Sequence, residues 1–146
     1  MHGGVGLAYE RFGRFEDAHE HLRKADDRLR GLGDGVGQAY NHMFISAVYD
    51  GQGELEAALT HTERALGLLM SAGIRIGTAK ALHGIGWYQT QLGRYAEAIE
   101  HCEKSVALHL ELGDRQGAGH ALTALAHAQH HLGQHEDAAK VLPAGA

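Results

Sequence analysis

The sequence repeats itself at an interval of forty residues. The segments "RFGRFEDA", "GQGELEAA", "QLGRYAEA" and "HLGQHEDA" begin at residues 11, 51, 91 and 131 and align without gaps. All four copies share a glycine at one place and an alanine at another, which are Gly13, Gly53, Gly93 and Gly133, and Ala18, Ala58, Ala98 and Ala138. A fixed period of this length is typical of chains that stack copies of one supersecondary unit. The repeat therefore restricts the fold to an array of similar units.

Apolar residues within each unit follow the spacing of a helix. Between residues 54 and 72, for example, Leu55, Leu59, Leu66 and Leu69 recur at intervals of three, four or seven, which places them on one helical face. No segment alternates as a strand does. Gly53 and its equivalents suit the left-handed turn that ends a helix. The pattern predicts an all-α fold of helical hairpins.

The predicted hairpins divide the chain at regular places. First helices are expected at about residues 35–51, 75–91 and 115–131, and second helices at about 54–72 and 94–112. The chain as a whole, residues 1–146, is expected to be a single domain. Its repeat units are about 1–34, 35–74, 75–114 and 115–146, with the first and last incomplete. Because no polar helix covers either end, we expect a segment of a longer protein or self-association through the uncapped ends.

The stretch "GLGDGVG", residues 31–37, contains four glycines and could be taken for a phosphate-binding loop. Such a loop needs a preceding strand, and its Walker form also needs a lysine followed by serine or threonine, which are missing here. Only Gly33 and Gly37 recur in later repeats. The stretch is interpreted as a turn between repeats. Within it Asp34, like Asp114 in a later turn, is expected to cap the helix that follows.

Charge and composition exclude several classes of protein. The chain has 13 lysines and arginines against 18 acidic residues, a formal charge of -5, so no cationic surface for nucleic acid is expected. No apolar run has the length of a membrane span, and Cys102 is the only cysteine, so no internal disulfide can form. We expect a cytoplasmic protein that binds neither nucleic acid nor membrane.

Small residues at two positions predict close packing within the hairpin. Gly86, near the middle of a first helix, and Ala98, near the start of a second, leave room that a large side chain would fill. At these positions the chain resembles a tetratricopeptide repeat array. The residues that meet the family pattern are Leu82, Ile85, Gly86, Tyr95, Ala98, Cys102 and Ser105.

The resemblance implies a right-handed α-superhelix, or solenoid, of about 3.5 repeats with a groove lined by the first helices. The usual unit has 34 residues and closes with a proline, whereas this one has forty and lacks that proline. Forty-residue units are similar to those of actinobacterial regulators and cell-polarity adaptors. Transferring the family's groove positions gives a peptide-binding set of Tyr40, Met43, Ala47, Asp50, Lys80, His83, Trp87, Thr90, Gln91, His120, Thr123, His127, His130 and His131.

Trp87 is the only tryptophan and the strongest single candidate in this groove. A partly exposed indole is a frequent binding hot spot, although Trp87 could also pack between neighbouring helices. Some tetratricopeptide domains hold a chaperone's terminal carboxylate with paired lysines and asparagines. The matching positions hold Met43, Ala47, His83 and Trp87, which supply neither that charge nor those amides, so this type of clamp is not expected.

Thirteen histidines raise the question of a metal. His127 and His131 are four apart on one helical turn, but two ligands do not complete a zinc site, so neither a metal nor a cofactor is expected. His21, His61 and His101 share one repeat position and are expected to face solvent. Titration of the groove histidines near neutral pH is a separate hypothesis.

The sequence favours binding over catalysis. Acidic residues that open the second helices complement the helix dipole, and Cys102 is expected to be buried and inert, so no catalytic residue is predicted. The leading hypothesis is a protein-binding or peptide-binding scaffold, as the regulatory or sensor segment of a larger cytoplasmic signalling or transcription regulator. The alternatives are a self-assembling structural module and a small-molecule sensor, which would need an enclosed pocket.

Overall fold

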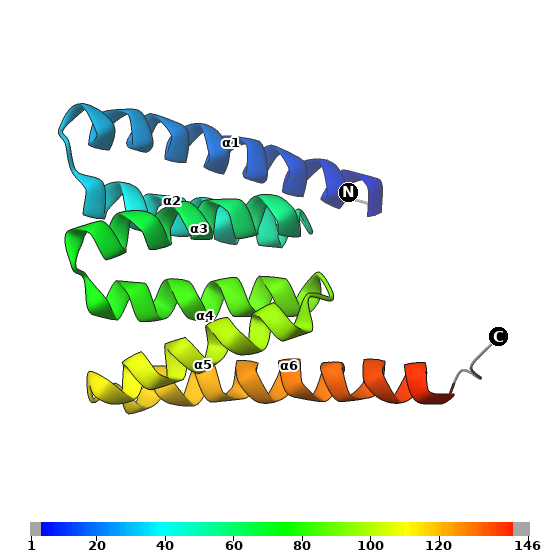
Figure 1. Cartoon of the computed structure of the whole chain (residues 1–146). Helices are drawn as coiled ribbons and strands as arrows, with labels where there is room; N and C mark the ends of the chain where they lie inside the picture. Colours follow the sequence, from blue (N-terminus) through cyan, green and yellow to red (C-terminus); the bar gives the residue numbers. More distant parts are fainter. Residues whose placement is uncertain (1–3, 142–146) are drawn as a thin grey trace. The chain divides into compact units, whose positions relative to one another are not determined.

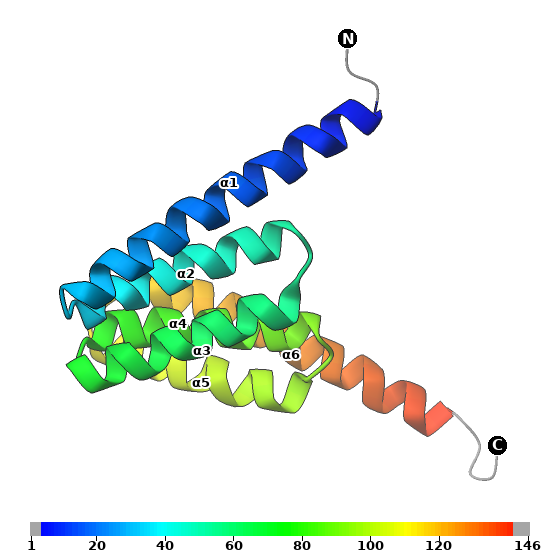
Figure 2. The same ribbon diagram turned by 90° about the horizontal axis from the view of Figure 1, so that it is seen from above.

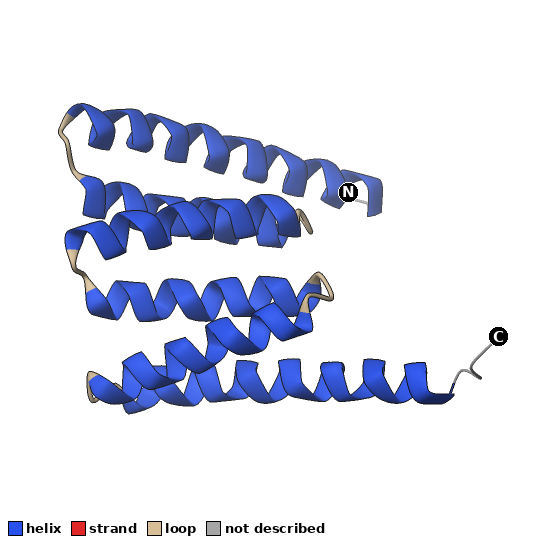
Figure 3. Ribbon diagram, in the orientation of Figure 1, coloured by secondary structure: helices blue, strands red, loops and turns tan. Residues whose placement is uncertain are grey.

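The structure, a computed structural model, describes the backbone of residues 4–141 and the side chains of residues 13–137. The described backbone forms helices joined by short turns and contains no strand, as Figures 1 and 3 show. The helices are α1 (Gly4–Gly31), α2 (Gly35–Gly51), α3 (Leu55–Ala72), α4 (Arg75–Gln91), α5 (Tyr95–Glu111) and α6 (Arg115–Val141). The predicted all-α fold is confirmed.

The chain divides into two compact units, Met1–Ala72 and Gly73–Ala146. Each unit contains three helices that follow one another along the chain. In the first unit α2 packs against both α1 and α3, and in the second each of the three helices packs against the other two. The pairs α2–α3 and α4–α5 are the hairpins that the repeat predicts.

A glycine in the left-handed region follows each of the first five helices. The φ angle ranges from 68° at Gly33 to 81° at Gly93. In the last of these turns the amide of Asp114 donates to the carbonyl of His109 over 2.8 Å, which satisfies a carbonyl at the end of α5. The prediction of left-handed turns is thus confirmed at Gly53 and Gly93.

The same prediction is wrong at Gly13 and Gly133, where α1 and α6 continue without a turn. A glycine permits a positive φ but does not require one, so the neighbouring contacts decide. Beyond residue 131, α6 stays straight and packs on the beginning of α5. The ring of Tyr95 lies 5.6 Å from that of His131 and 6.3 Å from that of His135, between centroids. The first helix of the last repeat therefore does not end at residue 131.

Aspartates begin two of the helices as predicted. Asp34 accepts a hydrogen bond from the amide of Gly37 over 2.8 Å, and Asp114 accepts one from Gly117 over 2.9 Å. A Cβ atom at Gly37 would lie 2.5 Å from the Asp34 carboxylate. The cap therefore explains the glycine three residues after Asp34 and after Asp114, but not Gly77, which follows Ile74, a residue without a side-chain cap.

Replacing Asp34 by alanine is expected to lower the free energy of unfolding by about 1 kcal/mol, because the amide of Gly37 loses its acceptor. Asp34→Asn keeps an acceptor oxygen and is the matched control, with a change of about a few tenths of a kcal/mol. Urea denaturation followed by circular dichroism measures both. Equal losses in the two variants would show that the carboxylate stabilises the chain in some other way.

Packing inside the two hairpins differs at one pair of positions. In α4–α5, a Cβ atom at Gly86 would lie 2.4 Å from the sulfur of Cys102 and 3.2 Å from the carbonyl oxygen of Ala98, so the helices approach closely there. In α2–α3 the equivalent residues are Ser46 and Thr62. The Thr62 hydroxyl donates to the Ser46 hydroxyl over 2.8 Å, and both side chains are buried. The same contact between the two helices of a hairpin is thus made by glycine and cysteine in α4–α5 and by serine and threonine in α2–α3.

Candidate functional site

An apolar hollow of about 370 Å³ lies between α4 and α6 of the Gly73–Ala146 unit. His83 and Trp87 face it from α4, and His120, Thr123 and Ala124 face it from α6. Residues three or four apart share one face of a helix, so each helix presents its lining side chains together. Trp87 keeps 38% of its surface exposed. We call these five residues the α4/α6 hollow.

A row of aromatic and imidazole rings extends from the hollow along α6. The Trp87 ring stacks on that of His127 at 5.6 Å between centroids. His127 meets His131 edge to face at 4.4 Å, and His131 in turn stacks on Tyr95 at 5.6 Å. Stacking on one side holds the indole in place while its exposed part remains free for a ligand.

The electrostatics of the hollow favour uncharged contacts. Burial lowers the pKa of His83, and the neighbouring His120 and His109 lower it further. His109 itself is buried, with Nδ1 3.0 Å from the carboxylate of Asp114. Near neutral pH, His83 therefore presents a neutral imidazole that can donate or accept a hydrogen bond.

Half of the predicted groove residues in this unit lie at or beside the hollow. His83, Trp87, His120 and Thr123 line it, and His127 stacks against it. The remaining members of the predicted set on α4 and α6 are Lys80, Thr90, Gln91, His130 and His131. Lys80, Gln91 and His130 are exposed outside the lining, and His131 belongs to the row of rings.

Two residues of this region depart from what the family positions suggest. Thr90 is only 4% exposed, and its hydroxyl donates to the carbonyl of Gly86 over 2.9 Å, so it has almost no surface to offer a ligand. Ala124 lines the hollow although it was not among the predicted residues. Its position, four residues after His120 on the same helical face, is the signal that could have identified it.

The Met1–Ala72 unit has an apolar hollow of its own, of about 530 Å³, between α1 and α2. We call it the α1/α2 face, and its lining consists of Phe15, Ala18, His21, Leu22, Phe44, Ala47 and Val48. Ala47 is the only one of these that was predicted as a groove residue. Tyr40, Met43 and Asp50 also lie on α2 and are half-buried. Phe44 was missed, and it is 63% exposed.

A cluster of rings fills the space between the three helices of the same unit. Nδ1 of His42 lies 3.0 Å from Nδ1 of His61, so one nitrogen donates and the other accepts. Tyr49 stands between His61, at 5.5 Å, and His19, at 4.3 Å, measured between ring centroids. The prediction that His61 faces solvent is wrong, because it is half-buried in this cluster. The same prediction is wrong for His101, which is half-buried against α4.

His21, His61 and His101 share one repeat position, and the residue that contacts His61 or His101 from the preceding helix determines the environment of that histidine. Tyr49 contacts His61, and the side-chain oxygen of its equivalent, Gln89, accepts a hydrogen bond from Nδ1 of His101 over 2.8 Å. His21, the third member of the series, is exposed as predicted. A shared repeat position therefore does not give the three histidines a shared environment.

Charged groups surround the histidine cluster in a cavity of about 260 Å³. Asp26 lies 3.9 Å from Nε2 of His42 and pairs with Arg30 over 2.8 Å, while Arg64 lines the same space. Burial lowers the pKa of His61 to about 4, and His42 and Arg64 add to the effect. Burial likewise lowers the pKa of His42, although Asp26 opposes this.

Acidification is expected to destabilise the Met1–Ala72 unit through His61. The unfolded chain binds a proton near pH 6.5 and the folded chain near pH 4, so the free energy of unfolding falls as the pH drops through that window. His61→Gln should flatten this dependence, measured by urea denaturation at several pH values. His21→Gln, at the same repeat position but exposed, is the control. An unchanged slope in His61→Gln would contradict the assignment.

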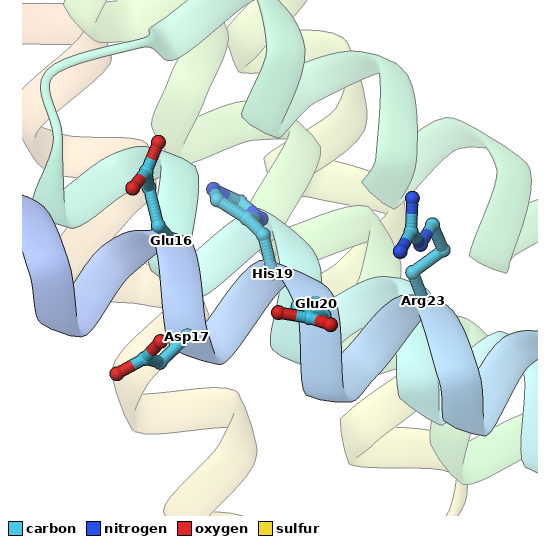
Figure 4. A pocket seen from close by; sticks show the side chains of 5 residues that line it. All are labelled: Glu16, Asp17, His19, Glu20 and Arg23. Carbon is cyan, nitrogen blue, oxygen red and sulfur yellow. The ribbon is translucent and has the colours of Figure 1, made fainter.

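A third hollow, of about 450 Å³, runs along α1 and is lined by residues of that helix alone. Figure 4 shows its side chains, which are Glu16, Asp17, His19, Glu20 and Arg23. Glu16, His19 and Arg23 are spaced by three and four residues and follow one side of the helix. The hollow is a shallow charged surface rather than a cleft between elements.

Cys102 lies in the packed interior as predicted, with no exposed surface. Burial, and to a lesser extent Glu103, raises the pKa of its thiol to about 11. A thiol of this kind stays protonated near neutral pH and is a poor nucleophile. Over the described residues, no three His, Cys, Asp or Glu side chains gather as a metal site would require. None of the described helices is both long and apolar enough to span a membrane.

Comparison with known proteins agrees with this architecture. Residues 77–142, which include the α4/α6 hollow, match the tetratricopeptide repeat family. No curated protein matches the sequence. Tetratricopeptide repeats form a non-catalytic scaffold fold for protein–protein interaction. Residues 77–142 thus belong to the tetratricopeptide repeat family, and the match together with the helices packed in consecutive pairs supports a tetratricopeptide repeat array.

Proposed function

We propose that the chain binds a protein partner through the α4/α6 hollow, with Trp87 as the main contact. The observation that carries this proposal is the exposure of 38% of the only tryptophan in an apolar hollow, where His127 stacks against it. A held, partly exposed indole supplies a large contact area at little cost in conformational entropy. Interfaces concentrate binding energy on such residues.

The lining defines the chemistry of the ligand. An apolar surface beside the indole suits an aliphatic or aromatic side chain of the partner. The imidazoles of His83 and His120 can exchange hydrogen bonds with the backbone on either side of that side chain. The hollow is open, as suits a polypeptide segment, whereas small-molecule sites are usually enclosed. We therefore infer a peptide segment with one apolar anchor residue.

A displayed library of random peptides, selected on the immobilised chain, tests this proposal. The selected peptides should share one aliphatic or aromatic position and should change the fluorescence of Trp87, which reports on the hollow without a label. The same selection on Trp87→Ala is the control. If the variant enriches the same peptides equally well, the hollow is not the binding site.

The forty-residue period, similar to that of actinobacterial regulators, supports a regulatory role. We propose that the scaffold acts as the partner-sensing segment of a longer cytoplasmic signalling or transcription protein. The reading frame around this segment tests the idea, since it should encode a DNA-binding or nucleotide-binding domain in the same chain. Stop codons closing the frame directly on both sides would contradict it.

A further inference from the structure

The α1/α2 face keeps exposed surface at positions that are fully covered elsewhere in the chain, because Phe44 is 63% exposed and Ala18, Leu22 and Val48 are only half-buried. Residues eighty positions later occupy the same places in the repeat. The equivalents of Ala18, Leu22, Phe44 and Val48 are Ala98, Cys102, Ala124 and Ala128. These four are at most 2% exposed, and α4 packs against both helices that carry them. A helix equivalent to α4 is thus missing from the α1/α2 face.

The repeat identifies which part of the sequence corresponds to that helix. Residues 4–11 align with residues 84–91, which form the second half of α4. In the structure they instead continue α1 through Gly13. The ring of Phe15 lies 3.2 Å from where a Cβ atom of Gly51, the last residue of α2, would stand.

Residues before Phe15 therefore extend past the end of α2, and Figures 1 and 2 both show the first turns of α1 projecting there. A straight α1 carries residues 4–11 away from the α1/α2 face of its own chain. The same helix can reach the equivalent face of another molecule, because its backbone projects beyond the end of α2.

We propose that residues 4–11 of a second copy of the chain cover the α1/α2 face, in a reciprocal exchange. Val5 and Gly6 align with Ile85 and Gly86, so the segment has the residue pattern of the helix that covers the equivalent face. Since Gly86 abuts Cys102, Gly6 lies against Leu22 of the other copy. Each molecule donates one segment and receives one, which closes a two-fold dimer.

The conformation at Gly13 determines whether the exchange occurs. If Gly13 turned as Gly53 and Gly93 do, the segment would fold back on its own chain. The helical conformation keeps the backbone hydrogen bonds of α1 unbroken and directs the segment outward. A Cβ atom at Gly13 would meet nothing within 4 Å, so an alanine there fits the straight helix without a clash.

Analytical ultracentrifugation of the chain and three variants tests the proposal. The chain should dimerise, and Gly13→Ala should tighten the dimer about tenfold, because alanine favours the helix and opposes a left-handed turn. Phe44→Ser should weaken it at least about thirtyfold by removing an exposed phenyl ring from the face. Leu110→Ala, which removes an exposed side chain from α5, should leave it unchanged. A chain that stays monomeric at millimolar concentration, or a dimer insensitive to Phe44→Ser, would overturn the proposal.

A disulfide between Gly6→Cys and Leu22→Cys distinguishes a second copy from the chain's own segment. The equivalent pair, Gly86 and Cys102, is close enough for a bond of this kind. Under oxidation the double variant should run as a covalent dimer on a non-reducing gel, joined between chains. A cross-link that forms within single chains would show that the segment folds back, and the exchange would be wrong.

Discussion

Replacing Gly86 by alanine is expected to destabilise the Gly73–Ala146 unit by about 2 kcal/mol, even though alanine is the better helix former. The new methyl group would stand 2.4 Å from the sulfur of Cys102 and 3.2 Å from the carbonyl oxygen of Ala98. Neither can withdraw easily, because Cys102 is fully buried and the carbonyl belongs to α5. Urea denaturation followed by Trp87 fluorescence reports this unit specifically.

The α2–α3 hairpin supplies a matched rescue of the same contact. Gly86→Ser and Cys102→Thr introduce the pair that stands at the equivalent positions, Ser46 and Thr62. Each single variant should be destabilised, the first by crowding and the second because a buried hydroxyl and a branched methyl group replace the thiol in a packed contact. The double variant should recover at least half of the summed loss. Strictly additive losses would show that the two positions do not interact.

Trp87→Ala is expected to weaken peptide binding by about thirtyfold or more, the effect of removing a hot-spot residue. The indole is the largest side chain in the α4/α6 hollow and the one stacked on His127. Because the ring is partly exposed, its loss should cost less stability than the loss of a fully buried side chain. Isothermal titration calorimetry with the peptides selected on the unmodified chain measures the change.

Leu110→Ala is the matched control for this loss of affinity. Leu110 is a large apolar residue, 58% exposed, on α5 and outside the hollow. Its replacement should leave peptide affinity within about twofold of the unmodified chain. Equal weakening by both variants would mean that general destabilisation, rather than a lost contact, explains the result for Trp87.

The helix boundaries could be predicted because two independent signals coincide. Apolar spacing marks the helices, and a glycine at each turn fixes where they end. The predicted helices 35–51 and 75–91 agree with α2 and α4, and the predicted 54–72 and 94–112 agree with α3 and α5 within one residue at either end. The close contact at Gly86 was also predictable, since a glycine in mid-helix calls for a packing reason.

Features that depend on contacts between helices could not be predicted in the same way. Gly13 and Gly133 share the motif of the turn glycines, yet local sequence does not show whether a partner surface keeps the helix straight. His61 resembles His21 by position, and only its contact with Tyr49 and His42 makes it half-buried. Repetition in the sequence thus identifies equivalent positions without fixing their surroundings.

Nuclear magnetic resonance mapping of a selected peptide on the isotope-labelled chain tests the central claim most directly. Binding through the α4/α6 hollow predicts the largest chemical-shift changes at the indole N–H of Trp87 and at the side chains of His83, His120 and Thr123, with little change at Leu110. Changes concentrated on the outer surface of α5, with the Trp87 indole signal unmoved, would contradict it.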